Sequence, residues 1–248
     1  MDSCIYTSPL PLYIGGNKMK KFLTYTTAVA SLSLVLTGCS GQQEKKTSDA
    51  KAQTEQTQAA STSKAIKINK EKLSEKDMKN MKAEVMKWAD QRAKQEGLAA
   101  SNRYFGAGEI TTGDWYAMTP KGEVQVSNQN DPGPKAFERH NLVGVVMYHS
   151  NKGVTGFDEN AKDLSNVEGY RNVADLTQPV TKYLFTDDGK VYECQFDSGQ
   201  QVTLSSGFAP KDHNDKDPNL RPDELFKVSE DESASELMSR LVKTYGKQ

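Results

Sequence analysis

Oxygen donors of the kind that bind hard cations are concentrated in one stretch near the end of the chain. Asp215, Asp217 and Asn219 have the i, i+2, i+4 spacing that opens an EF-hand calcium loop. The later positions depart from that motif, because Leu220 stands where glycine is required and Phe226 stands where a bidentate glutamate is required. Two interpretations therefore stay open: a weak calcium site at Asp215, Asp217 and Asn219, and a solvated loop.

Residues suited to hydrolysis are present but form no local motif. The three histidines, His140, His149 and His213, lie in separate segments, and the sequence contains no HExxH, CxxC or GxSxG pattern. His140 and His149 flank an apolar segment, where we interpret them as structural or solvent-facing. A glycosidase needs only two carboxylates, which can be distant in sequence. We assign no catalytic residue and no cofactor besides the possible calcium, and keep a hydrolase as an alternative.

Two neighbouring aromatic residues, Trp115 and Tyr116, follow a glycine-rich stretch. If exposed, their rings would offer a stacking surface for a sugar or a peptide, and if buried they would belong to the core. We name Trp115 and Tyr116 as candidate ligand-binding residues and keep the core as the alternative.

The cysteines have different surroundings. In the segment KVYECQF, strand alternation places Tyr192, Cys194 and Phe196 on one face, which predicts a buried and unreactive Cys194. Cys39 instead lies shortly after an uncharged apolar run from Phe22 to Leu36. Met19 and two lysines precede this run. A basic start followed by a short apolar run has the form of a secretory signal peptide.

The residues Leu36, Thr37, Gly38 and Cys39 resemble the lipobox of bacterial lipoproteins. The resemblance implies cleavage between Gly38 and Cys39 and attachment of a diacylglycerol, with palmitate among its acyl chains, to the Cys39 thiol. The mature protein would then be anchored in the cell membrane and face outside, since two acyl chains give stable anchoring. The eight residues before Cys39, SLSLVLTG, also resemble enterococcal peptide pheromones, so a pheromone precursor is a further alternative.

Composition divides the chain into four parts. Residues 1–18 are interpreted as a misassigned upstream extension, and 19–38 as the signal peptide. Residues 39–72 are the lipidated cysteine and a tether that is predicted to be disordered, because it is rich in Gln, Lys, Thr, Ser and Ala and has no aromatic residue. Residues 73–248 form the predicted domain. With 32 basic and 33 acidic residues, the chain lacks the charge excess typical of nucleic-acid binders.

The periodicity of the predicted domain changes from helix to strand and back. A helix is predicted from a capping box at Ser74 and Asp77 to Gly97. A second one is predicted up to Tyr245, with Ser229 as its cap and Glu232 three residues on. Strands are predicted between them; their ranges are Trp115 to Met118, Glu123 to Ser127, Leu142 to Tyr148, Lys182 to Thr186, Lys190 to Phe196 and Gln201 to Ser205. The sequence Asp187-Asp188-Gly189 predicts a hairpin turn. We therefore expect an α+β fold, an antiparallel sheet of five to six strands with the two helices packed on it.

Several motifs resemble an uncharacterised C-terminal domain of lipoproteins from lactobacilli, enterococci and relatives. They are Gly113-Asp114-Trp115-Tyr116-Ala117, Glu123-Val124-Gln125-Val126, Asp131-Pro132-Gly133-Pro134, the strand LVGVVMY and the hairpin around Gly189. The resemblance implies a Gram-positive source and a wall-facing position, but no established activity. We expect a non-catalytic module that binds the cell envelope, with a wall glycan or peptide as ligand and no nucleic-acid partner; the hydrolase alternative would act on wall material.

Overall fold

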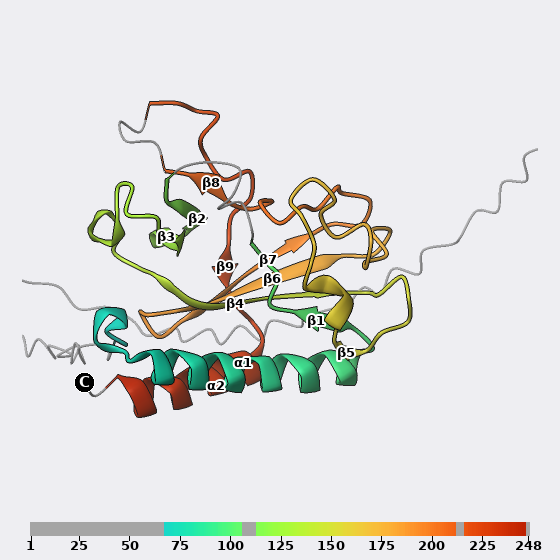
Figure 1. Ribbon diagram of the computed structural model, residues 1–248, viewed down its shortest axis with the longest axis horizontal. Coiled ribbons are helices and arrows are strands. Elements are labelled where there is room, and N and C mark those ends of the chain that lie inside the picture. The colour runs from blue at the N-terminus through green and yellow to red at the C-terminus, as the bar shows by residue number, and fades with distance from the viewer. Residues whose placement is uncertain (1–66, 106–112, 212–215, 247–248) are drawn as a thin grey trace, which may run out of the picture. The chain divides into compact units, whose positions relative to one another are not determined.

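The computed structural model describes residues 67–105, 113–211 and 216–246, which form an α+β domain (Figure 1). Its main sheet has six strands in the order β5-β1-β4-β6-β7-β9, and a second sheet has three strands in the order β3-β2-β8. The strands are β1 (Ala99–Ser101), β2 (Trp115–Thr119), β3 (Gly122–Ser127), β4 (Asn141–Tyr148), β5 (Gly156–Phe157), β6 (Val180–Thr186), β7 (Val191–Phe196), β8 (Ala209–Pro210) and β9 (Lys227–Val228).

The predicted antiparallel sheet is wrong in one respect, because the main sheet is mixed. Strand β5 pairs parallel with β1, while the other pairs in this sheet are antiparallel. The second sheet was also not predicted as a separate unit. The strands of two or three residues, β1, β5, β8 and β9, are too short to leave a period in the sequence.

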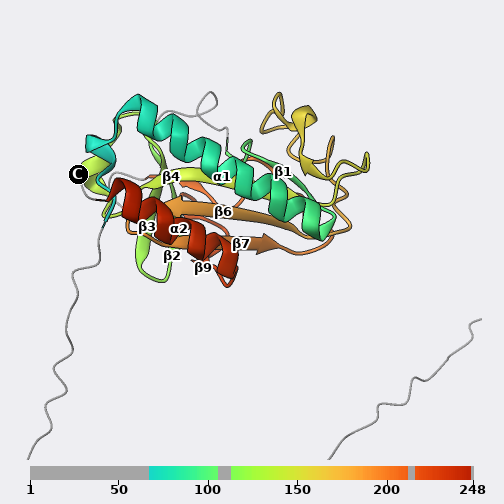
Figure 2. The ribbon, with the colours of Figure 1, turned by 90° about the horizontal axis from the view of Figure 1, so that it is seen from below.

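Two α-helices, α1 (Glu75–Glu96) and α2 (Glu232–Tyr245), lie side by side against one face of the main sheet (Figures 1 and 2). The predicted capping box of α1 is confirmed, and Gly97 ends this helix in the left-handed region at φ 70°. The predicted cap of α2 is wrong: Asp231 accepts from the N–H of Ala234, and Ser229 instead donates to Glu193 at 2.6 Å.

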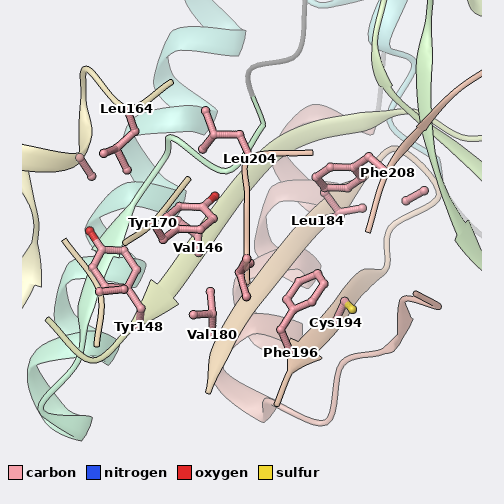
Figure 3. Close-up of a cluster of buried hydrophobic side chains, with 14 of the residues drawn as sticks. Val146, Tyr148, Leu164, Tyr170, Val180, Leu184, Cys194, Phe196, Leu204 and Phe208 are labelled. Carbon is pink, nitrogen blue, oxygen red and sulfur yellow. The ribbon is translucent and has the colours of Figure 1, made fainter. Parts of the chain in front are cut away.

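The two faces of the main sheet are buried against different partners. Alternate residues of β4 and β6, such as Val145 and Phe185, pack on the helices, where Trp88 of α1 contacts Phe185 edge to face. The intervening residues pack beneath loops and the second sheet, and Figure 3 shows that Cys194 and Phe196 belong to this second cluster. Cys194 is 3% exposed, so its predicted burial is confirmed.

The expected strand from Gln201 to Ser205 is absent. This segment has no regular structure, and its apolar residues Val202 and Leu204 fill the core beneath the sheet. Its backbone carbonyls bond elsewhere, since those of Thr203 and Leu204 accept from the buried Nζ of Lys182 at 3.0 Å each. These two carbonyls therefore bond to a buried lysine and not to a neighbouring strand.

The domain begins before Leu73, where we had placed its boundary. The side chain of Ile68 is 1% exposed, and its N–H donates to the carbonyl of Asp187 at 2.8 Å. A short 3₁₀ helix, η1 (Lys70–Lys72), follows with Asn69 as its cap. Two more such helices are η3 (Pro134–Ala136) and η4 (Glu159–Ala161).

Candidate functional site

A pocket of about 430 Å³ lies between residues 67–71, the second sheet and the adjoining ends of β4 and β6. Its volume is within the range of small-molecule sites. We call it the N-terminal pocket. Its lining comes from five short segments of the domain: Lys67, Ile68, Asn69, Lys70, Glu71, Gln125, Asn128, Pro134, His140 and Asp187.

A histidine and a carboxylate are joined at this pocket. His140 Nδ1 lies 2.7 Å from Asp187 Oδ2, and the backbone N–H of His140 donates to Asp187 Oδ1 at 2.9 Å. The other ring nitrogen, Nε2, lies 2.9 Å from the carbonyl oxygen of Pro134. Both nitrogens can donate only in the imidazolium form. The hydrogen bond to Asp187 accordingly raises the pKa of His140, against the effect of burial.

Lys70 adds a second cationic group to the pocket. Its Nζ donates to the backbone carbonyl of Asn141 at 3.0 Å. Within the described residues, this is the one hydrogen bond of the ammonium group. An ammonium has three N–H groups, so two are left for a ligand. Burial lowers the pKa of Lys70, and the nearby Asp187 carboxylate opposes this change.

Gln125 supplies an unsatisfied polar atom. Its side chain is 2% exposed, and its Nε2 donates to Asp114 at 2.9 Å, but no group in the described residues donates to its Oε1. Buried acceptors without a donor are rare in folded proteins, and each costs about 1–3 kcal/mol. Gln125 lines the pocket, but this acceptor atom is itself buried away from the cavity surface.

A buried carboxylate fixes the loop that carries Pro134. Asp114 is fully buried; besides the Gln125 amide, it accepts from the backbone N–H groups of Gln129, Asp131 and Gly133 at 2.5, 3.4 and 2.7 Å. Two of the sequence motifs, GDWYA and DPGP, are thereby joined in space. Together they hold the loop that precedes η3 in the chain at the wall of the pocket.

The lining consists of charged, amide, imidazole and apolar side chains. None of the described residues that line the pocket is Ser, Thr, Cys or Tyr, so no hydroxyl or thiol nucleophile faces it. A general base needs a free lone pair, and the imidazolium of His140 has none. The lining also contains two carboxylates, Glu71 and Asp187, of which Asp187 is already bonded to His140.

The structure separates Trp115 and Tyr116. Successive strand residues point to opposite faces, so Trp115 packs in the cluster under the main sheet, while Tyr116 packs on Phe137 with ring centroids 6.4 Å apart. Their exposed fractions are 8% and 4%. One groove cannot take both rings as stacking surfaces, and a binding role for either residue stays a prediction.

One of the two rings borders a smaller hollow of about 270 Å³. Trp115 lines it together with Asn219, Arg221 and Asp223. Two residues that the sequence analysis assigned to different ligands, Trp115 and Asn219, are therefore brought to the same place by the tertiary structure.

The proposed calcium ligands lie only partly within the described residues. Asp215 is outside them, and Asp217 Oδ1 accepts from the backbone N–H of Asn219 at 2.8 Å. No group of three or more His, Cys, Asp or Glu residues suited to a metal occurs in the described part of the chain. Calcium binding stays a prediction.

The lipidation and cleavage residues, Gly38 and Cys39, lie outside the described residues, as do the predicted signal peptide and the tether up to residue 66. Across residues 67–105, 113–211 and 216–246, no helix is long and apolar enough to cross a membrane. The anchoring therefore stays a prediction from sequence.

The sequence analysis missed the N-terminal pocket. His140 was interpreted as structural or solvent-facing, and Asp187 as the first residue of a hairpin turn. The two residues are 47 positions apart, and no spacing rule joins them. A weak signal existed, since His140 precedes a strand and Asp187 follows one, and antiparallel strands bring such ends together.

No family model matches the chain, nor does any curated protein or solved structure.

Proposed function

We propose that this protein is a lipid-anchored extracytoplasmic lipoprotein whose domain binds a component of the cell envelope in the N-terminal pocket. The lipobox at Cys39 supports the anchoring. The pocket carries the binding proposal, because it combines apolar walls and cationic groups in one cavity.

The charge of the lining favours an anionic ligand. Lys67, Lys70 and protonated His140 contribute three positive charges, and Glu71 and Asp187 contribute two negative ones. Asp187 is neutralised by its contact with His140, which leaves Lys70 as the half-buried cation with free N–H groups. Since the surroundings are partly desolvated, a charge-assisted hydrogen bond there is stronger than one at an exposed lysine.

The position of the pocket in the chain fits an anchored receptor. Its first wall, Lys67 to Glu71, lies at the end of the segment 39–72 that the sequence analysis assigned to the tether. In the proposed arrangement, a ligand of the envelope contacts the domain beside the point where the membrane-attached part of the chain begins.

The test is retention of the full chain, purified in detergent, by purified cell wall. We compare two variants that each replace one exposed lysine by tryptophan. Lys67→Trp places an indole on the pocket lining, whereas Lys72→Trp places it on the same segment outside the lining. We expect loss of retention with Lys67→Trp and unchanged retention with Lys72→Trp.

Equal retention of the two variants would contradict binding through this pocket. Mass spectrometry of the soluble fraction tests the hydrolase alternative in the same experiment. Wall fragments released by the unchanged chain would support hydrolysis. If the unchanged chain releases fragments and Glu71→Gln does not, Glu71 takes part in the reaction.

A further inference from the structure

The residues that open the domain differ in charge from those that follow. Residues 67–94 contain nine basic and five acidic residues, whereas residues 95–248 contain 16 basic and 24 acidic ones. The first part is therefore cationic and the second part is anionic, although the whole chain is close to neutral. If the cationic residues share one face, the domain has a positive side that an anionic partner can recognise.

The exposed side of α1 is rich in lysine. Buried residues of this helix, Met81 and Trp88 among them, face the sheet. The opposite side is a stripe of residues at alternating spacings of four and three, made of Lys76, Asn80, Ala83, Lys87, Asp90 and Lys94. Asp90, the one acid of this stripe, accepts from Lys94 at 2.8 Å and from the backbone N–H of Phe157 at 2.9 Å. We call the exposed lysines on this side the lysine face: Lys76, Lys79, Lys87 and Lys94.

Neighbouring charges leave the lysine face positive. At about 100° per residue, the other acids of α1 lie on the flanks of the helix; they are Glu75, Asp77, Glu84 and Glu96. The exposed charged residues of α2 are two acids and two bases: Glu232, Glu236, Arg240 and Lys243. The second helix therefore adds no net charge to the exposed side of the helical layer.

The helical layer forms one face of the domain. Figure 2 shows α1 and α2 side by side in front of the main sheet. The second sheet lies across the main sheet from them, where its residues Trp115, Ala117 and Val124 belong to the cluster on the other face (Figure 1). A flat partner that contacts the lysine face would thus have the second sheet on its far side.

The lysine face lies close to the proposed anchor along the chain. Lys67, the first described residue, comes 28 positions after Cys39, and η1 and the Ser74 cap lead directly into α1. A flexible chain of this length spans about 30 Å. A lipid on Cys39 would therefore keep α1 within reach of the bilayer, where a weak attraction acts at a high effective concentration.

We propose that the lysine face of α1 lies on the anionic lipid surface of the membrane in which the chain is anchored, with the second sheet pointing away from it. This inference rests on the proposed anchoring and goes beyond the binding function. An anionic surface attracts the lysine face and repels the anionic remainder of the domain, which sets the orientation. The membrane is favoured over an anionic wall polymer because the anchor holds the membrane, and not the polymer, at this distance.

Acetylation of lysines tests the proposal on the full chain, purified in detergent and reconstituted into vesicles. Vesicles of phosphatidylcholine alone are compared with vesicles of phosphatidylcholine and phosphatidylglycerol in equal parts. Brief treatment with acetic anhydride, a neutral reagent, followed by mass spectrometry gives the reaction rate of each lysine. We expect the lysine face to react about fivefold more slowly on the anionic vesicles, and high salt to remove this protection.

Two exposed lysines on the side of the second sheet are the internal controls. Lys121 lies in the turn between β2 and β3, and Lys135 lies in η3, beside Phe137 that packs on the second sheet. Both should react equally fast on the two kinds of vesicle. Equal protection of these lysines and of the lysine face would overturn the proposed orientation.

Two double variants test whether charge on this face causes the contact. Lys76→Gln with Lys87→Gln removes two charges from the lysine face, and we expect the protection of Lys79 on anionic vesicles to be largely lost. Lys121→Gln with Lys135→Gln removes the same charge from the other side and should keep that protection. All four substituted positions are exposed, so the fold should be unaffected. Unchanged protection of Lys79 in the first variant would overturn the electrostatic contact.

Flotation of the same vesicles separates this inference from the anchoring beneath it. If the chain floats with both kinds of vesicle and the lysine face reacts equally on both, the anchoring stands and the orientation is overturned. If it floats with the anionic vesicles alone and the lysine face is protected, the anchoring fails and the contact stands. Flotation with neither would overturn both. Protection by anionic polymer extracted from purified wall, without protection by anionic vesicles, would overturn the assignment to lipid.

Discussion

Lys182 lies fully inside the domain and organises the loop above it. Its Nζ donates to the backbone carbonyls of Thr203, Leu204 and Ser206 at 3.0, 3.0 and 2.7 Å, and it lies 4.7 Å from the ring centroid of Phe208. Burial lowers the pKa of Lys182 to about 7, while three acceptors match the three N–H groups of an ammonium. The lysine therefore serves the fold, since each of its donors is already used.

Replacing Lys182 by methionine keeps the volume of the side chain and removes its donors. The three carbonyls would be left buried without partners, so we expect a loss of about 3 kcal/mol or more in the free energy of unfolding. Urea denaturation followed by circular dichroism measures it. Lys190→Met, at an exposed site on the same hairpin, is the control and should stay within about 0.5 kcal/mol of the unchanged chain. A loss below about 1 kcal/mol for Lys182→Met would contradict the structural role.

His140 should make the stability of the domain depend on pH. Its pKa is raised in the folded state, above the usual 6.5, chiefly by the hydrogen bond to Asp187. Protonation of His140 therefore stabilises the folded form: the contribution is fully present below pH 6.5 and is lost as the pH rises through the folded pKa. His140→Gln should lower the free energy of unfolding by about 2 kcal/mol at pH 5.5.

The measurement is urea denaturation of the unchanged chain and of His140→Gln from pH 5.5 to 9. The difference in the free energy of unfolding between the two proteins should shrink as the pH increases. His149→Gln, which changes an exposed histidine, is the matched control and should leave the pH profile unchanged. A difference that is constant over this range would show that His140 does not titrate as the geometry implies.

Among the elements, α1 is specified by its own ends. Ser74 Oγ accepts from the N–H of Asp77 at 3.1 Å, and the Asp77 carboxylate accepts from the N–H of Ser74 at 3.2 Å, so both bonds of the capping box are formed. The buried stripe of the helix then packs on the sheet, and Trp88 reaches α2 through a hydrogen bond to Ser233 of 2.8 Å. Local signals set the limits of the helix, and tertiary contacts set its partner.

Removal of the cap of α1 should be measurable without any change in the core. Ser74→Ala leaves the first backbone N–H groups without an acceptor, and such changes cost about 1 kcal/mol. Chemical denaturation measures the loss. Ser235→Ala, at an exposed helical position of α2, should be neutral or slightly stabilising, because alanine is the better helix former. Equal effects of the two substitutions would argue against a capping role for Ser74.

For the whole molecule, the proposed lipid anchor would decide where the domain can act. If Cys39 carries a diacylglycerol, the protein should incorporate labelled palmitate and sediment with membranes. Cys39→Ala should abolish both. Cys4→Ala, which changes a cysteine in the segment that we interpret as a misassigned extension, should behave like the unchanged chain. Membrane association of Cys39→Ala equal to that of the unchanged chain would refute the lipid anchor.

Sequence alone determined the features that depend on neighbours along the chain. The α1 cap, the turn at Asp187 to Gly189, the buried strand from Leu142 to Tyr148 and the burial of Cys194 all follow from short-range periodicity and turn chemistry, and all are present. Tertiary structure decided what depends on distant residues. The parallel pairing of β5, the absence of a strand at 201–205 and the pocket at His140 each arise from contacts between segments that no spacing rule joins. The physical reason is that a local period fixes which face of an element is apolar, whereas the partner of that face is chosen by packing in the folded chain.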